Sequence, residues 1–304
     1  MLARIEEALH SRRERRVEQK MTAIDSVLQG LIDYAGLYPP ASLDMRTALC
    51  SYLGHAKSKH AAALGRFIVD LNRLSELRNL AGNSLRNLKV SVIGPATADW
   101  DSLPMLLDDG VSIEAVEIKT DEPAEIDRIT TLLPSGLDAY FEVPLQANIA
   151  AALDDLSAAG VRAKLRMGGV VADAFPSAEA IAQMLSAFSM RRVPFKATAG
   201  LHYPIRSRHL FTYAPDSPTG TMHGFVNLVC AAALIHFGGD EDEARVLLNE
   251  EDPAAWNISP DTIAWRSFQW STEQLREVRQ QFFISIGSCS FVEPMHGLEA
   301  LGWL

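Results

Sequence analysis

The 304-residue sequence contains only three cysteines, Cys50, Cys230 and Cys289. No two of them form a CxxC pair, so the pattern indicates neither a disulfide framework nor a structural zinc site. The sequence opens without an apolar stretch of the kind found in signal peptides, and its longest apolar run, FVNLVCAAALIHF, is too short to span a bilayer. We therefore expect a cytoplasmic protein with no membrane partner.

Positive charge is also scarce. The sequence has 28 Lys and Arg residues against 38 Asp and Glu residues, which gives a formal net charge of -10. The field of such a protein repels nucleic acid, so we expect no nucleic-acid partner.

No low-complexity tract or Pro/Gly/Ser-rich linker divides the chain, and we expect one domain over residues 1–304. Short apolar strands alternate instead with amphipathic helical stretches, which is typical of parallel strands joined by right-handed helical crossovers. The strand candidates are residues 31–37, 65–70, 88–95, 113–120, 137–145, 161–169, 193–201 and 283–291. Eight units over about 275 residues match the size of a (β/α)8, or TIM, barrel. A doubly wound open sheet would also alternate, but no GxGxxG motif follows the first strand.

Two segments lie outside this alternation. Residues 1–28 predict an N-terminal helical extension that caps the bottom of the barrel or serves a homo-oligomer contact. Residues 202–282 form a long connection between the seventh and eighth strands, with an apolar helix at 225–237. Its Trp-rich stretch WNISPDTIAWRSFQW could itself be a strand, which would change the strand numbering.

Ionisable side chains alternate with apolar ones in several of the predicted strands. Because alternate residues of a barrel strand face the interior, the charged set is predicted to point inward, toward the mouth at the strands' carboxyl ends. The inward set comprises Asp33 on the first strand, Arg66 and Asp70 on the second, Glu117 and Lys119 on the fourth, Tyr140 and Glu142 on the fifth, Lys164 and Arg166 on the sixth, and Lys196 with Thr198 on the seventh. A structural ion-pair network is the alternative, but buried ion pairs are often no more stabilising than apolar replacements. Stability alone therefore explains the set poorly.

Small residues follow the last three predicted strands. Gly168 and Gly169 end the sixth strand, Gly200 ends the seventh, and Ser288 lies in the GSCS segment of the eighth. Such residues let backbone N–H groups approach a ligand, and the loops after the last strands of barrels often bind phosphate. With Arg166 beside them, they predict a small anionic substrate.

Lys164 and Lys196 lie on adjacent strands. A lysine amine is a nucleophile only when it is unprotonated, and burial together with a second cation lowers its pKa toward neutrality. Glu117 and Glu142 could move protons at the substrate. This layout predicts Schiff-base chemistry on a carbonyl compound, which needs no organic cofactor.

The segments AKLRMGG and FKATAGL resemble the class I aldolases of the deoxyribose-phosphate aldolase type. In that family one lysine forms the imine and the lysine of the next strand lowers its pKa. The resemblance implies that Lys164 forms the imine and that Lys196 assists it, while the family's acid/base aspartate has no assigned counterpart. The segments DYAGLYPP, FKATAGLHYP, MHGF and GSCSFVEP also resemble a group of bacterial proteins with no assigned activity. The resulting prediction is a lyase acting on a phosphorylated or carboxylated sugar-like metabolite.

Other functions stay open. His202 follows the seventh strand and is expected to hold the polar end of the substrate, but with His223, Glu117 and Glu142 it could bind a divalent metal such as Mg or Zn. That set would suit a metal-dependent enolising lyase or isomerase acting on a carboxylate.

Cys289 is either a nucleophile or a small buried thiol, and the local sequence supplies no histidine partner for it. A barrel that binds a ligand without chemistry is the third class. It is favoured if the inward charges pair with one another away from solvent.

Overall fold

The computed structural model describes residues 21–82, 88–103, 112–120, 124–143 and 149–304. Eight parallel strands close into a barrel in the order β1-β13-β7-β6-β5-β4-β3-β2. They are β1 (Ile32–Tyr34), β2 (Leu64–Asp70), β3 (Lys89–Pro95), β4 (Ser112–Lys119), β5 (Asp138–Val143), β6 (Arg162–Arg166), β7 (Phe195–Thr198) and β13 (Phe283–Ser288). Each of these strands lies within a range predicted from the sequence, except that β2 and β4 begin one residue before theirs. The predicted TIM barrel is confirmed.

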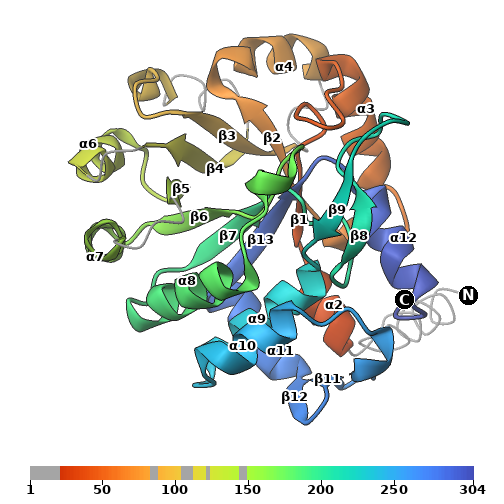
Figure 1. The fold of residues 1–304 in the computed structure, drawn as a ribbon. Helices are drawn as coiled ribbons and strands as arrows, with labels where there is room; N and C mark the ends of the chain where they lie inside the picture. The colour runs from red at the N-terminus through yellow and green to blue at the C-terminus, as the bar shows by residue number, and fades with distance from the viewer. Residues whose placement is uncertain (1–20, 83–87, 104–111, 121–123, 144–148) are drawn as a thin grey trace, which may run out of the picture.

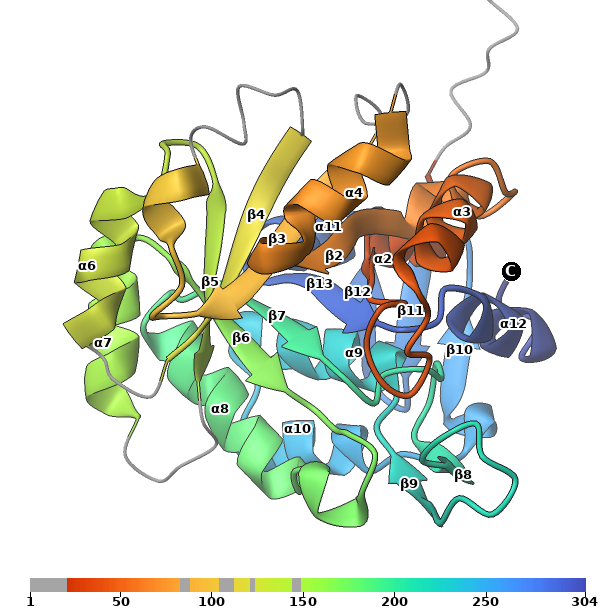
Figure 2. The ribbon, with the colours of Figure 1, turned by 90° about the horizontal axis from the view of Figure 1, so that it is seen from above.

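Helices surround this barrel, as Figures 1 and 2 show. They are α2 (Ala23–Leu28), α3 (Met45–His55), α4 (Leu74–Ala81), α6 (Ala124–Leu132), α7 (Ala150–Ala159), α8 (Ala178–Met190), α9 (Phe225–His236), α10 (Glu241–Leu248), α11 (Thr272–Gln281) and α12 (Val292–Ala300). Short 3-10 turns are η1 (Ala61–Ala63), η2 (Leu71–Arg73), η4 (Trp100–Ser102), η5 (Ala172–Ala174) and η6 (Pro253–Ala255). No helix of the described ranges is long and apolar enough to cross a bilayer.

The alternation of side chains along β4 shows how the sequence separates two layers of packing. Val116 and Ile118 are buried in the apolar core of the molecule, which also holds Ile126 and Ile129 of α6. Glu117, between them, points into the barrel and is also buried. The apolar layer between strands and helices thus holds the fold together, and β4 places a carboxylate in the barrel interior.

The register of neighbouring strands brings the inward groups to similar depths. Along the barrel wall, Glu142 of β5 pairs in register with Lys164 of β6, which in turn pairs with Lys196 of β7. Parallel partners in register face the same side of the sheet. The two lysines therefore share one face of the barrel wall.

The connection between β7 and β13 spans the predicted residues and contains two antiparallel sheets outside the barrel. The hairpin β8 (Ser207–Leu210) and β9 (Thr219–Met222) was not predicted. The Trp-rich segment forms β10 (Trp256–Ile258), β11 (Thr262–Trp265) and β12 (Phe268–Ser271), which pair only with one another. The barrel therefore keeps the eight strands that the sequence predicted.

The described part of the N-terminal extension is α2, at the bottom of the barrel; residues 1–20 of the predicted helix lie outside the described residues. The buried side chain of Arg279 on α11 ties α2 in place. It donates hydrogen bonds to the carbonyl oxygens of Val27 and Gln29, at 2.8 and 3.1 Å, and of Phe283, at 2.7 Å.

Candidate functional site

A cavity of about 260 Å³ opens at the carboxyl ends of the barrel strands. Its wall comes from the strands and from the loops that follow them, as expected of the chemistry-bearing face of a TIM barrel. The lining residues are Ala35, Tyr38, Pro39, Pro40, Ile68, Ile93, Glu117, Lys164, Arg166, Gly169, Val170, Thr198, Ala199, Gly200, His202, Phe211, Met222, Gly287 and Cys289. Of the predicted site residues, this cavity brings together Glu117, Lys164, Arg166, Gly169, Thr198, Gly200 and His202.

Below the cavity lies a buried cluster of charges that centres on Glu117. The Lys196 ammonium donates to Glu117 Oε1 at 2.7 Å and to Asp33 Oδ2 at 2.6 Å. The Lys164 Nζ lies 3.1 Å from Glu117 Oε2 and 3.3 Å from Glu142 Oε2. Glu117 thus bridges the two amines, one on each carboxylate oxygen.

Hydroxyl and backbone groups complete the hydrogen bonding of the two buried carboxylates. Ser91 donates to Glu117 Oε1 at 2.8 Å. Asp33 accepts from the Ser285 hydroxyl and from the Arg66 backbone N–H, each at 2.8 Å. Buried charges that are paired and hydrogen-bonded in this way are held in one geometry.

The electrostatics of the cluster keep Lys196 protonated and Glu117 ionised. Burial opposes the charged form of Lys196, but Asp33 and Glu117 outweigh it and hold the pKa of Lys196 well above its usual value. Burial likewise opposes the charge on Glu117, yet Lys196 and Lys164 together hold the pKa of Glu117 far below its usual value. The prediction that a neighbouring lysine lowers the pKa of Lys196 is therefore wrong. Glu117 lies between the two amines, and Asp33 also pairs with Lys196.

Only one of the two lysines can meet a ligand in this conformation. Lys196 is 0% exposed, and its Nζ lies 5.3 Å from the centre of the Tyr140 ring. Lys164 lines the cavity, and its side chain is 6% exposed. The amine of Lys164 is thus the reactive candidate, with Lys196 beneath it.

The turns after β6 and β7 are shaped by glycine. A Cβ on Gly168 would lie 3.0 Å from the Gly200 Cα and 2.6 Å from the ring of Phe175. Gly200 has a φ of +71° and follows Ala199, whose φ is +68°. These glycines allow the two turns to pack closely, which is a structural need.

The remaining predicted anion-binding residues differ in their placement. Arg166 is exposed and lines the cavity, and its Nε donates to the Gly168 carbonyl at 3.2 Å. The hydroxyl of Ser288 is buried and donates to the Ser290 carbonyl at 2.8 Å, within its own turn. Arg166 is therefore an exposed cation at the cavity wall, and Ser288 shapes the loop.

The four residues considered as metal ligands find other partners. Glu117 and Glu142 face Lys164, His202 Nδ1 bonds Glu293 at 2.7 Å, and His223 Nε2 bonds the Pro176 carbonyl at 2.7 Å. Within the described ranges, no group of three or more His, Cys, Asp or Glu side chains is arranged to hold a metal ion.

A second cluster at the cavity was missed from the sequence. His202 Nε2 lies 3.9 Å from the Cys289 thiol, and Glu293 bonds the other ring nitrogen of His202. The signal that could have found it is topological, because Cys289 and His202 follow β13 and β7, which are neighbours in a closed barrel.

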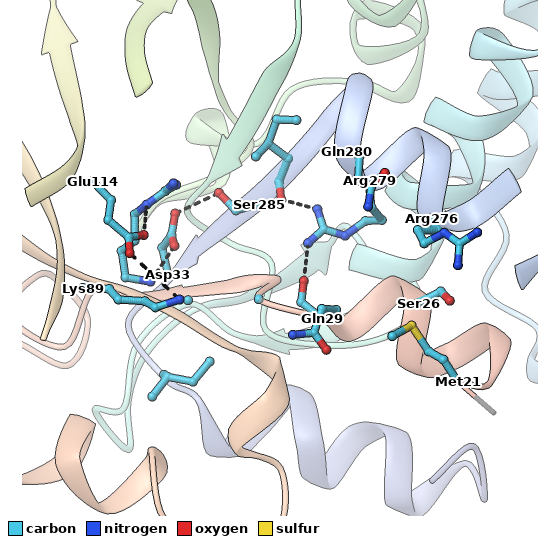
Figure 3. A pocket seen from close by; sticks show the side chains of 15 residues that line it. Met21, Ser26, Gln29, Asp33, Lys89, Glu114, Arg276, Arg279, Gln280 and Ser285 are labelled. Carbon is cyan, nitrogen blue, oxygen red and sulfur yellow. Dashed lines mark hydrogen bonds and ion pairs between the residues drawn. The ribbon is translucent and has the colours of Figure 1, made fainter. Parts of the chain in front are cut away.

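A separate cavity of about 330 Å³ lies at the bottom of the barrel, between α2, α11 and the starts of the strands (Figure 3). Arg66, predicted with the inward set, lies here rather than at the mouth. It forms ion pairs with Glu114 at 3.2 Å and with Asp138 at 2.7 Å. Since barrel enzymes keep their chemistry at the other end, we assign this network to stability.

Comparison with models of known families finds none that matches the chain. A search of curated protein sequences likewise finds no match. The geometry of the mouth cavity therefore has to indicate the function.

Proposed function

We propose that this protein is a Schiff-base lyase that acts on a small anionic carbonyl compound, with Lys164 as the amine that forms the imine. One observation carries the proposal: a nearly buried amine lines the mouth cavity between two carboxylates. An amine that attacks a carbonyl must first lose a proton. Glu142, 3.3 Å away at the edge of the cluster, is placed to accept it.

The chemistry of the imine agrees with the charges around Lys164. The neutral amine adds to the carbonyl carbon, the proton taken up by Glu142 is returned to the carbinolamine oxygen, and water leaves to give an iminium ion. This ion carries the same positive charge as the ammonium it replaces. Glu117 is kept ionised by Lys196 and is already hydrogen-bonded in place, so it stabilises the iminium without reorganisation. Lys196 is thus a positioning residue.

The cavity indicates the class of substrate. A volume of about 260 Å³ is at the small end for ligand sites, which suits a small metabolite. The guanidinium of Arg166 at its wall fits a carboxylate or phosphate, which it can bind with two parallel hydrogen bonds. A phosphorylated or carboxylated sugar-like carbonyl compound meets both conditions.

A ligand-binding barrel without chemistry is the second candidate. It is favoured by the complete pairing of Lys196, which touches two carboxylates and is fully buried. In that case the cluster serves as a rigid floor, and Lys164 contributes only charge to a bound anion.

Borohydride reduction separates these two functions. The protein is incubated with glyceraldehyde 3-phosphate, pyruvate or glyoxylate, then reduced and weighed by intact-protein mass spectrometry. We expect one stable adduct per chain with at least one of these probes. Lys164→Met should abolish the adduct, because the amine is lost. Lys89→Met is the matched control: its side chain is 63% exposed at the opposite end of the barrel, and the adduct should persist. Equal adduct formation by both variants would refute the imine.

A further inference from the structure

The thiol of Cys289 lies at the mouth cavity beside a histidine from a neighbouring strand. Cys289 follows β13 and His202 follows β7, 87 residues away in the sequence. The Sγ of Cys289 and the Nε2 of His202 are 3.9 Å apart, and both side chains are buried and line the cavity. A nucleophile and a base thus lie within reach of each other and of a ligand.

Glu293 of α12 fixes the orientation of the imidazole. The Nδ1–H of His202 donates to Glu293 Oε2 at 2.7 Å, which leaves Nε2 to face the thiol. The Tyr213 hydroxyl donates to the same carboxylate oxygen at 3.0 Å, and the backbone N–H of Glu293 donates to Ser290 Oγ at 3.2 Å. His202 and Tyr213 thus both donate to Glu293 Oε2, and this carboxylate keeps Nδ1–H of the ring on its side while Nε2 faces the thiol.

The surroundings of His202 favour a positive charge on its ring. Burial opposes the charged form of His202, but hydrogen bonds with Cys289 and Glu293 outweigh it and raise the pKa of His202 to about 9. The pKa of Glu293 is lowered against the effect of burial by its hydrogen bond to His202. His209 also faces the cluster; burial lowers its pKa, so it adds no second positive charge near pH 7.

We propose that Cys289 is a second nucleophile of the mouth cavity, activated by His202 and Glu293, and that it adds to the carbonyl carbon of a small aldehyde. In the thiolate–imidazolium pair the thiol proton is carried by His202 Nε2, and the thiolate Sγ forms a bond to the carbonyl carbon. The π electron pair of the C=O bond moves to oxygen, which takes the proton from Nε2. The product is a neutral thiohemiacetal, and no oxidant is needed. The aldehyde class rests on the proposed function, whereas the activation of the thiol does not.

The other two cysteines provide comparisons within the same molecule. Cys50 is exposed on α3. Cys230 is fully buried in α9, and burial holds its pKa well above the usual value. An ordinary thiol with a pKa near 8.5 is only about 0.3% thiolate at pH 6. A thiolate–imidazolium pair therefore reacts faster with an alkylating agent at pH 6 than an ordinary thiol does.

The test measures alkylation by iodoacetamide at pH 6 and pH 8.5, with each cysteine quantified by peptide mass spectrometry. At pH 6 we expect Cys289 to react at least about tenfold faster than Cys50. His202→Gln should lower the rate of Cys289 at pH 6 at least about tenfold, because the thiolate loses its partner cation. His60→Gln is the matched control. His60 does not line the cavity, and its ring lies 3.0 Å from Glu299, so this variant should leave the alkylation rate of Cys289 unchanged.

The aldehyde is tested with glycolaldehyde in the absence of any reductant. It should slow the alkylation of Cys289 but not of Cys50, and the protection should persist in Lys164→Met, which cannot form the imine at residue 164. Cys289 reacting no faster than Cys50 at pH 6 in the unmodified protein would overturn the thiolate, whether or not the variants fold. A reactive Cys289 that glycolaldehyde fails to protect in Lys164→Met would overturn the addition to aldehydes. Neither result depends on the imine of Lys164.

Discussion

Replacing Lys196 by Met tests the central role of the buried ammonium. The side chain is 0% exposed and its Nζ contacts Asp33 at 2.6 Å and Glu117 at 2.7 Å. Removing one partner of a buried ion pair costs about 3–5 kcal/mol, because a buried charge is left without compensation. Among the described residues, the hydrogen-bond partners left to Asp33 would be neutral, the Ser285 hydroxyl and a backbone N–H, although Arg66 and Arg279 would still act on it electrostatically. Glu117 would keep Lys164. We therefore expect a loss at the upper part of that range, borne mainly by Asp33.

The assay is urea unfolding at pH 7, with the free energy of unfolding compared between variants. The double variant Lys196→Met with Asp33→Asn should recover about 1–3 kcal/mol relative to Lys196→Met alone, because the uncompensated carboxylate is removed. Lys89→Met serves as control, and its solvent-exposed contact with Glu114 should be worth about 1 kcal/mol or less. If Lys196→Met matches this control, or Asp33→Asn gives no recovery, the reasoning about the cluster is wrong.

Three further predictions concern the rim of the cavity. Gly200→Ala should lower the free energy of unfolding by about 1–3 kcal/mol in urea, because residue 200 has a φ of +71°. Gly54→Ala is the control: Gly54 lies in α3 with open space around it, and this variant should raise the free energy of unfolding by about 0.5–1 kcal/mol. The raised pKa of His202, about 9, means that its contribution to stability is complete below its unfolded pKa near 6.5 and is lost as pH rises through 9. Unfolding measured from pH 6 to 10 should show this loss in the unmodified protein but not in His202→Gln. Arg166→Met should raise the KM for an anionic substrate at least about tenfold while kcat changes little, because only binding is weakened. An unchanged KM would show that Arg166 does not bind the anion.

The barrel could be predicted from the sequence because its signal is repetitive. Apolar strands alternate with amphipathic helices eight times, and this pattern has few solutions other than a closed or open parallel sheet. The hairpin of β8 and β9 could not be predicted, since each strand has four residues and half-exposed side chains. The Trp-rich segment was ambiguous for a related reason: its strands are short and pair only locally.

The inward direction of the site residues was predictable, but their partners were not. Alternation along a strand indicates which face a side chain takes, and it placed Glu117, Lys164 and Lys196 in the barrel. It does not tell which atoms meet. The expectation of two mutually repelling amines failed because Glu117 lies between them.

The contacts of Cys289 needed knowledge of three separate segments. His202 is 87 residues away along the chain, and Glu293 comes from the helix that follows β13. Tyr213 comes from the loop of an unpredicted hairpin. The local sequence around Cys289 supplies Glu293 but neither His202 nor Tyr213, whereas the order of strands in the barrel brings Cys289 and His202 together.

The most direct test of the account is to map the residue that carries the adduct after borohydride reduction, by tandem mass spectrometry of proteolytic peptides. The account predicts that the mass increment lies on Lys164, at the mouth, in the peptide that contains β6. An increment on Lys196, or one spread over exposed lysines such as Lys89, would contradict it.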